Sequence, residues 1–281
     1  MRRRLLVSSL AGIAAGLALI GFAHSLPDAG AVPDGGAVAR PKGAGGSSVF
    51  SQTVRTPGSR VETVGRSAEG RPIVLRQYGI AAIDGEVLAF GCIHGDECAG
   101  RILRPLTQIT SFCPDPSSDV YVVPNLNPDG LALGTRLNGR GVDLNRNFPA
   151  GWEPIGERGE AEHSGPRPFS EPESRLAARI VSRLRPEVTI WFHQHYAPRP
   201  LVRAWGRSVP DARRYARLAG LPFRRMAWPA GTAPHWQNRR LSHGSSFVVE
   251  MPRGELPQGR KAQLERALVR LGRSVARVGE D

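Results

Sequence analysis

The sequence predicts an α/β domain in which helices cover both faces of a mixed β-sheet. Short runs rich in Val, Ile and aromatic residues alternate along the 281-residue chain with longer segments of helical periodicity. A chain of this length suits one folded domain with an additional tail. We expect strands near residues 61–64, 73–78, 87–93, 120–124, 188–192 and 247–250, and helices near 97–110, 171–184, 211–218 and 260–278.

Local patterns support the individual elements. The run 87–93 is apolar and gives way to a helix candidate, and the run 188–192 is β-branched and aromatic, as strands are. Pro252 is expected to end the strand before it, because proline cannot donate a backbone hydrogen bond. Ser170 and Glu173 have the spacing of a capping box, which predicts that a helix begins there.

The amino-terminal residues predict export. Arginines at positions 2–4 precede an apolar stretch over residues 5–23, and Ala23-His24-Ser25 carries the small residues that a signal peptidase prefers. We therefore expect a signal peptide over residues 1–25 and an extracellular or cell-envelope protein. The alternative is an uncleaved membrane anchor facing outward, because the apolar stretch is long enough to span a bilayer.

A linker and a folded domain are expected to follow. Residues 26–48 are rich in Gly, Ala and Pro, which predicts a disordered tether. The folded domain is then expected over residues 49–281.

The basic composition permits two interpretations. A net charge of +13 favours anionic envelope polymers or membrane headgroups as partners. Lys42 and Lys261 are the only lysines among the 38 basic residues, however, which indicates GC-biased coding. No nucleic-acid-binding module and no interleaving of Arg with aromatic residues is present, so nucleic acid is excluded as a partner.

Three cysteines occur in a chain that is expected to meet an oxidising compartment. If residues 97–110 form a helix, Cys98 and Cys113 lie at its opposite ends, roughly 20 Å apart and beyond disulfide reach. Cys92 and Cys98 flank the same turn, so a bridge between them and free buried thiols both stay open.

The segment His94-Gly95-Asp96-Glu97 is a candidate metal site. It sets an imidazole and a carboxylate three residues apart where the apolar run 87–93 ends. From such a junction both side chains can face one zinc ion and leave positions for a third ligand and a water molecule. Taken alone the pattern is weak, because His, Asp and Glu also cap helices at such turns.

Polar segments downstream provide candidates for a substrate site. Asn127-Pro128-Asp129-Gly130 predicts a turn, and residues 141–148 follow as a polar segment with little periodicity. Within that segment, Arg146 offers a planar fork suited to a carboxylate, and Asn145 can add a hydrogen bond. A solvated loop is the alternative interpretation.

Two later strands also end in polar side chains. His193 and His195 would share one face of the strand that begins at residue 188, so either can be a third ligand. Glu250 is the last residue of the apolar strand near residues 247–250. Open α/β sheets bind ligands at this end of their strands. Burial there could raise the pKa of its carboxyl toward working pH and make it a general base.

In this order the motifs resemble the zinc carboxypeptidase family, over residues 65–252. Residues 65–73, 94–97, 134–138 and 170–173 are most similar to its murein peptide amidase branch. The resemblance implies a zinc-carboxypeptidase-like mixed sheet and one zinc ion per chain. It also implies three metal ligands, which are His94, Glu97 and His193, with His195 as the second choice for the last.

The resemblance further assigns the catalytic and binding roles. Glu250 matches the base that activates water and protonates the leaving amine, and Arg136 matches the side chain that stabilises the oxyanion. Asn145 and Arg146 match the pair that holds the substrate carboxylate, and Asp143 matches a carboxylate that orients the first His. Residues 229–245 lack the mobile Tyr of the digestive members, so substrate closure must differ.

The function implied is that of an exported zinc amidopeptidase or carboxypeptidase. The murein branch implies a peptide substrate and cleavage of the γ-D-glutamyl-diaminopimelate bond, and we expect a monomer. Three alternatives are a general zinc carboxypeptidase, a zinc deacylase of N-acyl amino acids and a non-catalytic envelope-binding module. Retention of His94, Glu97, Arg136 and Glu250 argues against the last.

Overall fold

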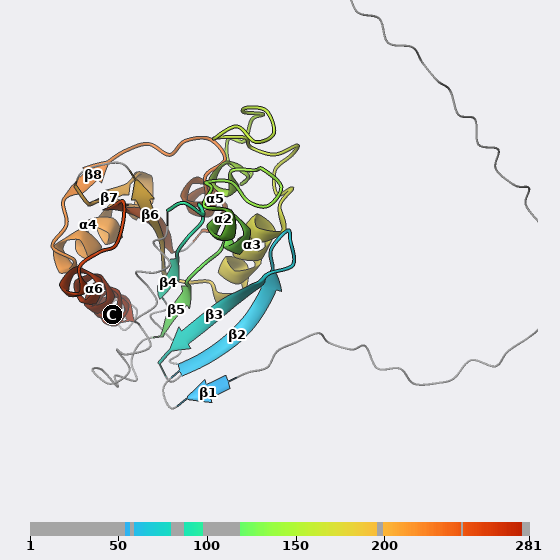
Figure 1. Ribbon diagram of the computed structural model, residues 1–281. Coiled ribbons are helices and arrows are strands. Elements are labelled where there is room, and N and C mark those ends of the chain that lie inside the picture. The colour runs from blue at the N-terminus through green and yellow to red at the C-terminus, as the bar shows by residue number, and fades with distance from the viewer. Residues whose placement is uncertain are drawn as a thin grey trace, which may run out of the picture. The chain divides into compact units, whose positions relative to one another are not determined.

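The apolar runs of the sequence form strands of one mixed sheet (Figure 1). The computed structural model describes residues 54–56, 59–79, 87–97, 119–195, 199–242 and 244–276, and within these ranges nine strands are hydrogen-bonded in the order β1-β2-β3-β5-β4-β6-β9-β7-β8. The strands are β1 Val54–Thr56, β2 Ser59–Arg66, β3 Pro72–Tyr78, β4 Val87–Phe90, β5 Val120–Val123, β6 Val188–His195, β7 Leu201–Ala204, β8 Phe223–Arg225 and β9 Ser245–Pro252.

Parallel strands form the centre of this sheet. β4 pairs in parallel with β5 and β6, and β6 pairs in parallel with β9. On one side of this centre, β1, β2, β3 and β5 form successive antiparallel pairs. On the other side, β7 pairs antiparallel with β9 and in parallel with β8. The mixed sheet expected from the sequence is therefore confirmed.

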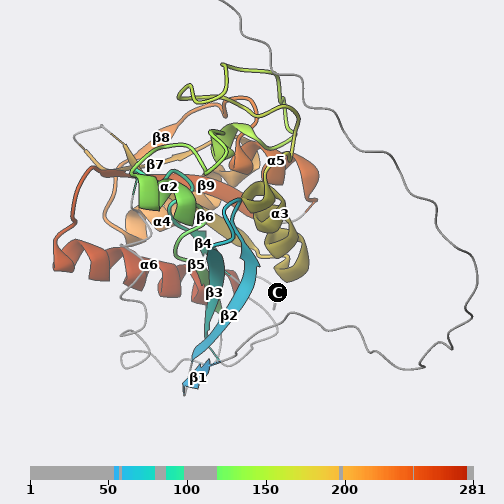
Figure 2. The same cartoon turned by 45° about the vertical axis from the view of Figure 1, so that its right-hand side comes forward.

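Helices cover both faces of the sheet, as predicted (Figures 1 and 2). α3 and α5 pack on one face, and α4 and α6 pack on the other. The helices of the described residues are α2 Pro128–Leu133, α3 Pro172–Leu184, α4 Val209–Leu218, α5 Ala233–Arg240 and α6 Gln258–Ala276, with the 3₁₀ helices η2 Leu144–Arg146 and η3 Gly206–Ser208.

β4 and β5 are apolar or aromatic throughout because both of their faces are buried. Val87 and Ala89 of β4 pack with α4 and α6, whereas Leu88 and Phe90 pack with α3 and α5. The Phe90 ring stacks on Trp191 of β6, with ring centroids 4.2 Å apart. The sheet thus separates two hydrophobic cores.

Several expectations fall outside the described residues. They concern the signal peptide 1–25, the linker 26–48, most of the helix at 97–110, and the pairing of Cys98 and Cys113. Within the ranges that the structure describes, no helix is long and apolar enough to cross a membrane.

Two local predictions were wrong. The predicted turn at 127–130 is the start of α2: the side chain of Asn127 caps the helix by accepting a hydrogen bond from the Gly130 amide at 2.9 Å. The capping box predicted from Ser170 and Glu173 is not formed, because Glu173 instead accepts from the Ala68 amide at 2.8 Å and supports a distant segment.

Six short elements of the described residues were not predicted, namely β1, β7, β8, α5, η2 and η3. β8 has the sequence Phe-Arg-Arg, and α5 has Trp236 as its one large apolar side chain. Neither β8 nor α5 has enough apolar residues to show the hydrophobic periodicity of a strand or a helix. Packing against the rest of the domain decides their conformation.

Asn147 joins the segment after η2 to the start of α3. Its side-chain Nδ2 donates to the backbone carbonyl of Ser164 at 2.9 Å and to the hydroxyl of Ser170 at 2.8 Å. Its oxygen accepts from the amide of Glu171 at 3.1 Å and from the hydroxyl of Ser174 at 2.6 Å. Asn147 is fully buried, so these groups have no access to bulk water there.

We predict that Asn147→Ala lowers the free energy of unfolding by roughly 2–4 kcal/mol, because several buried polar groups lose their partner together. Urea denaturation of the zinc-loaded protein would measure this loss. Leu133→Ala is the control, since Leu133 is 63% exposed and should change stability by less than about 0.5 kcal/mol. Equal losses in the two variants would contradict the role of Asn147.

Glu265 is a buried carboxyl on α6. It is 3% exposed, and its Oε1 has no hydrogen-bond partner among the described residues. Burial raises the pKa of Glu265 to about 7, although Arg266 and Lys261 act to lower it. Because the pKa is higher in the folded state than in the unfolded chain, folding is penalised once the carboxyl ionises.

Glu265 should therefore make the wild type less stable as the pH rises from 5 to 8, because the unfolded chain releases this proton near pH 4.5 whereas the folded protein keeps it up to about pH 7. Relative to Glu265→Gln, the wild type should lose on the order of 2 kcal/mol over this range. Chemical denaturation at both pH values would test this. The exposed Glu153→Gln should behave like the wild type, and parallel pH profiles for all three proteins would refute the prediction.

Candidate metal and substrate site

Parallel pairing brings the carboxyl ends of β4, β6 and β9 to one edge of the sheet. His193 is the direct partner of Glu250 in the β6–β9 pair, and Phe90 at the end of β4 is the partner of Trp191 in the β4–β6 pair. The chain that leaves β4 therefore turns beside the end of β6. Open α/β sheets bind ligands at such an edge.

The turn after β4 is held by the segment that leads into α2. The amides of Leu126 and Asn127 donate to the carbonyls of Gly91 and Cys92 at 3.0 and 2.9 Å. The side-chain nitrogen of Asn127 also donates to the carbonyl of Ile93 at 3.3 Å. Cys92 has a φ of 49°, a left-handed conformation that is costly for a residue with a Cβ and persists where surrounding contacts impose it.

Gly95 permits the close approach of this turn to α2. A Cβ at position 95 would lie 1.9 Å from the carbonyl carbon of Gly130. Any side chain there would push the turn away from α2. The glycine between His94 and Glu97 is therefore required by packing.

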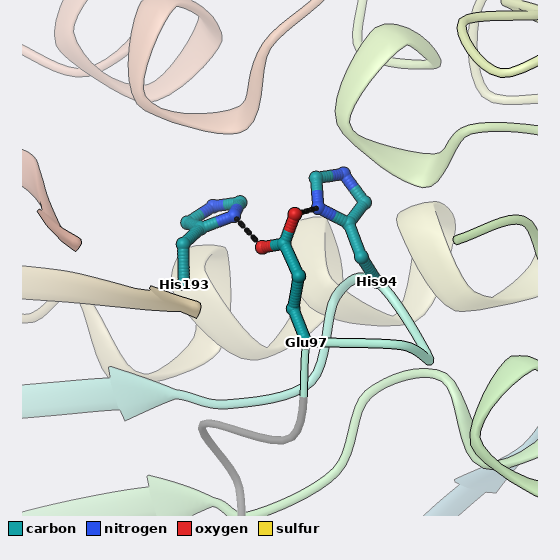
Figure 3. Close-up of side chains that lie close together, drawn as sticks. All are labelled: His94, Glu97 and His193. Atoms are coloured by element: carbon teal, nitrogen blue, oxygen red, sulfur yellow. Dashed lines mark hydrogen bonds and ion pairs between the residues drawn. The ribbon is translucent and has the colours of Figure 1, made fainter. Parts of the chain in front are cut away.

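His94, Glu97 and His193 form a buried cluster at this edge (Figure 3). Glu97 extends between the two imidazoles, with Oε1 3.0 Å from Nδ1 of His94 and Oε2 2.9 Å from Nδ1 of His193. The three candidate ligand atoms lie within 4.8 Å of one another. The structure thus brings together the three ligands assigned from the sequence, while the side chain of His195 lies outside the described residues.

Asp143 sets which nitrogen of His94 faces the cluster. Its Oδ1 lies 3.1 Å from Nε2 of His94, and the carboxylate is fully buried. In the neutral form of His94 that binds a metal, the Nε2–H donates a hydrogen bond to Asp143, which leaves the Nδ1 lone pair directed at the cluster. Two imidazole nitrogens and one carboxylate in this arrangement are a donor set that fits zinc with a coordination position left open.

The charges of the cluster compensate one another. Burial opposes the charged form of His94, but Asp143 and Glu97 outweigh it and raise the pKa of His94 to about 9. Burial likewise opposes ionisation of Glu97 and Asp143, yet their cationic neighbours, His94 foremost, hold both pKa values well below the usual range. Both carboxylates therefore stay ionised and offer negative charge to a cation.

Arg136 lies across these carboxylates. Its Nε donates to Oδ2 of Asp143 at 2.9 Å, and its Nη1 donates to Oε1 of Glu97 at 3.2 Å. Burial acts to lower the pKa of Arg136, but Asp143 and Glu97 outweigh it and raise that pKa. A permanently charged guanidinium therefore stands beside the candidate ligands.

A cavity of about 230 Å³ opens at the cluster. The first-choice metal ligands and the catalytic and substrate-binding residues assigned from the sequence all line it, namely His94, Glu97, Arg136, Asn145, Arg146, His193 and Glu250. These residues span more than half of the chain, and the fold gathers them in one place.

Glu250 presents one carboxylate oxygen without a protein partner. Its Oε1 lies 3.4 Å from Nη1 of Arg203, whereas its buried Oε2 has no hydrogen-bond partner within the described part of the chain. Such an oxygen can accept a proton from a molecule in the cavity.

Arg146 and Asn145 stand in the wall of the same cavity. Nη2 of Arg146 lies 2.5 Å from Oε1 of Glu162, whose side chain is 56% exposed. Oδ1 of Asn145 accepts from the Ala233 amide at 3.0 Å, which anchors η2 to α5. The exposed partner of Arg146 can be replaced by a carboxylate of a ligand.

Further residues of the cavity wall were not found from the sequence. They are Glu162, Arg203, Trp228, Pro229, Thr232, Pro234 and Val248. Most lie on β7 or in the segment that leads into α5, where the sequence has no recognisable pattern. Only their contacts in the fold assign them to the site.

The chain is similar to known zinc carboxypeptidases in sequence. A sequence profile of the family described as zinc carboxypeptidase matches residues 52–220. Murein peptide amidase A of Escherichia coli K12 is 33% identical over 155 residues, which cover 48% of this chain and 60% of the relative. Carboxypeptidase B of Astacus astacus is 27% identical over 179 residues, covering 54% and 59%. The aligned parts thus span less than two thirds of either relative.

Solved structures show the same fold. Carboxypeptidase A from Helicoverpa armigera has a TM-score of 0.66 at 17% identity, covering 80% of this chain and 70% of its own. Murein-tripeptide amidase from Escherichia coli O157 has a TM-score of 0.58 at 28% identity, covering 78% and 93%. Because the family profile matches more than half of the sequence, the chain belongs to the zinc carboxypeptidase family, whose cofactor is the zinc ion expected from the sequence.

Proposed function

We propose that this protein is a zinc-dependent amidopeptidase or carboxypeptidase that hydrolyses cell-wall peptides, at the γ-D-glutamyl-diaminopimelate amide bond. One observation carries the proposal: a single cavity is lined by the three candidate zinc ligands, by Glu250 and by the pair Asn145 and Arg146. The 33% identity to murein peptide amidase A supports the choice of substrate.

Glu250 is the general base of the proposed reaction. Zinc, when bound by His94, Glu97 and His193, lowers the pKa of water and polarises a carbonyl group. The unpartnered Oε2 of Glu250 takes a proton from a water molecule while the oxygen of that water bonds to the amide carbon. Glu250 then returns this proton to the amide nitrogen as the C–N bond breaks, which releases an amine and a carboxylic acid.

Arg136 stabilises the negative charge that develops on the amide oxygen. Its guanidinium is held by Asp143 and Glu97, so it is already oriented before the substrate arrives. Preoriented donors need no reorganisation when charge appears, which is why they lower the barrier effectively.

Arg146 and Asn145 bind the carboxylate that lies next to the scissile bond. Arg146 pairs with Glu162 at the cavity mouth, and a substrate carboxylate can take the place of that exposed partner. A planar guanidinium pairs with a carboxylate through two parallel hydrogen bonds, which sets both distance and orientation.

Export as a monomer to the cell envelope is also part of the proposal. Residues 1–25 have the pattern of a signal peptide, and murein peptides occur outside the cytoplasmic membrane. Amino-terminal sequencing of protein recovered outside the cytoplasm should begin at Leu26, whereas an intact amino terminus in the membrane fraction would establish an anchor.

We predict about one zinc ion per chain, bound by His94, Glu97 and His193. His94→Ala, Glu97→Ala or His193→Ala should weaken zinc binding by more than the roughly 100-fold that loss of a supporting residue causes. Metal analysis after dialysis against a weak chelator would measure this. His195→Ala should keep its zinc, and the reverse result for the two histidines would move the third ligand to His195.

Glu250→Gln should leave the protein folded and loaded with zinc but slow it by at least about 100-fold, because an amide cannot take the proton from water. The turnover number of purified enzyme on a fixed peptide tests this, with zinc content measured on the same sample. Turnover near that of the wild type would remove Glu250 from the mechanism.

The peptide specificity separates the proposed function from its alternatives. L-Ala-γ-D-Glu-diaminopimelate should be hydrolysed in preference to its α-linked isomer, to ordinary dipeptides and to N-acyl amino acids. Amidation of the carboxylate beside the scissile bond, or Arg146→Met with the unmodified peptide, should cut kcat/KM by roughly two orders of magnitude.

Mass spectrometry of the products would identify the bond that is cut. Preference for α-linked peptides would make the protein a general carboxypeptidase, and preference for N-acyl amino acids would make it a deacylase. Turnover of none of these compounds by zinc-loaded protein would favour the envelope-binding module.

A further inference from the structure

Arg203 is a charged residue of the cavity that the proposed mechanism does not use. It lies on β7, which pairs antiparallel with β9 so that Arg203 is the partner of Val248 and Leu201 the partner of Glu250. The side chain of Arg203 is 19% exposed and lines the same cavity as the candidate ligands. It is therefore the third arginine of this cavity, after Arg136 and Arg146.

The guanidinium of Arg203 is incompletely satisfied by the protein. Its Nη1 lies 3.4 Å from Oε1 of Glu250, longer than the roughly 2.8 Å of a strong charge-assisted bond. Its Nε is buried and has no hydrogen-bond partner among the residues that the structure describes. A buried donor without an acceptor is costly, so this nitrogen is suited to an acceptor that enters with a ligand.

Trp228 places a second such donor next to Arg203. The guanidinium carbon of Arg203 lies 5.8 Å from the centre of the Trp228 ring. The indole Nε1 is also buried and lacks a partner in the described ranges. Both side chains line the cavity and contact each other, so together they offer two unpartnered N–H groups and one positive charge, a combination that suits a carboxylate.

We propose that Arg203 and Trp228 bind a second substrate carboxylate, carried by the side chain of the residue that follows the scissile bond. This inference rests on the proposed function, in which Arg146 binds the carboxylate next to that bond. The preferred substrate class is then a peptide whose last residue carries two carboxylates. Diaminopimelate meets this requirement, because its side chain ends in a carbon that bears both an amine and a carboxylate.

Lysine provides a matched comparison for diaminopimelate. The two residues differ only in the distal carboxylate, which replaces one hydrogen on the amine-bearing carbon of the lysine side chain. L-Ala-γ-D-Glu-meso-diaminopimelate and L-Ala-γ-D-Glu-L-Lys therefore isolate the group assigned to Arg203. A second pair, an N-blocked α-linked dipeptide ending in 2-aminopimelate or in norleucine, asks the same question without the γ-linkage.

For the wild type, kcat/KM should favour the diaminopimelate peptide over the lysine peptide by roughly 10- to 100-fold. Arg203→Met should bring this ratio close to one, and Trp228→Phe, which removes only the N–H, should lower it by several-fold. Arg179→Met is the control, since Arg179 is exposed on α3 and does not line the cavity. The ratio is the diagnostic quantity, because a general effect of Arg203 on Glu250 would change both rates together.

Binding provides a readout that is independent of turnover. Calorimetry should give tighter binding of free meso-diaminopimelate than of L-lysine to the wild type, and equal binding of both to Arg203→Met. Zinc content and thermal stability of each variant show that it is folded and loaded.

The outcomes separate this inference from the proposed function. If the γ-linked peptides are hydrolysed with the same diaminopimelate-to-lysine ratio by the wild type and Arg203→Met, the inference is overturned and the proposed function stands. If neither γ-linked peptide is hydrolysed but the 2-aminopimelate dipeptide is favoured in an Arg203-dependent way, the inference stands and the murein assignment fails.

Discussion

The parallel register of β4, β6 and β9 is the constraint on which the site depends. It places His193 beside Glu250 on neighbouring strands, at the spacing of about 4.8 Å that separates paired strands. Val249 and Met251, on either side of Glu250, pack into the core beneath α4 and α6. A slip of β9 by one residue would turn Glu250 into that core, so packing on both faces of the sheet keeps His193 and Glu250 side by side.

Ion pairs connect His94, Arg136 and Asp143 to this edge of the sheet through Glu97. Glu97 and Asp143 are buried carboxylates, and each contacts both His94 and Arg136. A buried charge without a partner is strongly destabilising, so the turn after β4 and the segments bearing Arg136 and Asp143 must be in place together. The same arrangement leaves negative charge directed at a cation, which links the stability of this region to its metal.

The three arginines of the cavity are suited to different tasks because their partners differ in exposure. Arg136 is held by two buried carboxylates and is oriented before substrate binds. Arg146 pairs with the exposed Glu162, which a substrate can displace. Arg203 makes a long contact to Glu250 and keeps a buried nitrogen without a protein acceptor. The residue type alone does not distinguish these three environments.

The sequence by itself determined the features that depend on neighbours along the chain. His94 and Glu97 stand out because both flank one turn, and the apolar runs that become β4, β6 and β9 identify strands buried on both faces. Only the tertiary structure decided that His193 meets Glu97 and that Glu173 supports a distant segment instead of capping α3. Contacts of that kind join segments whose separation along the chain leaves no periodic signal, so their partners emerge only when the sheet and its helices are packed.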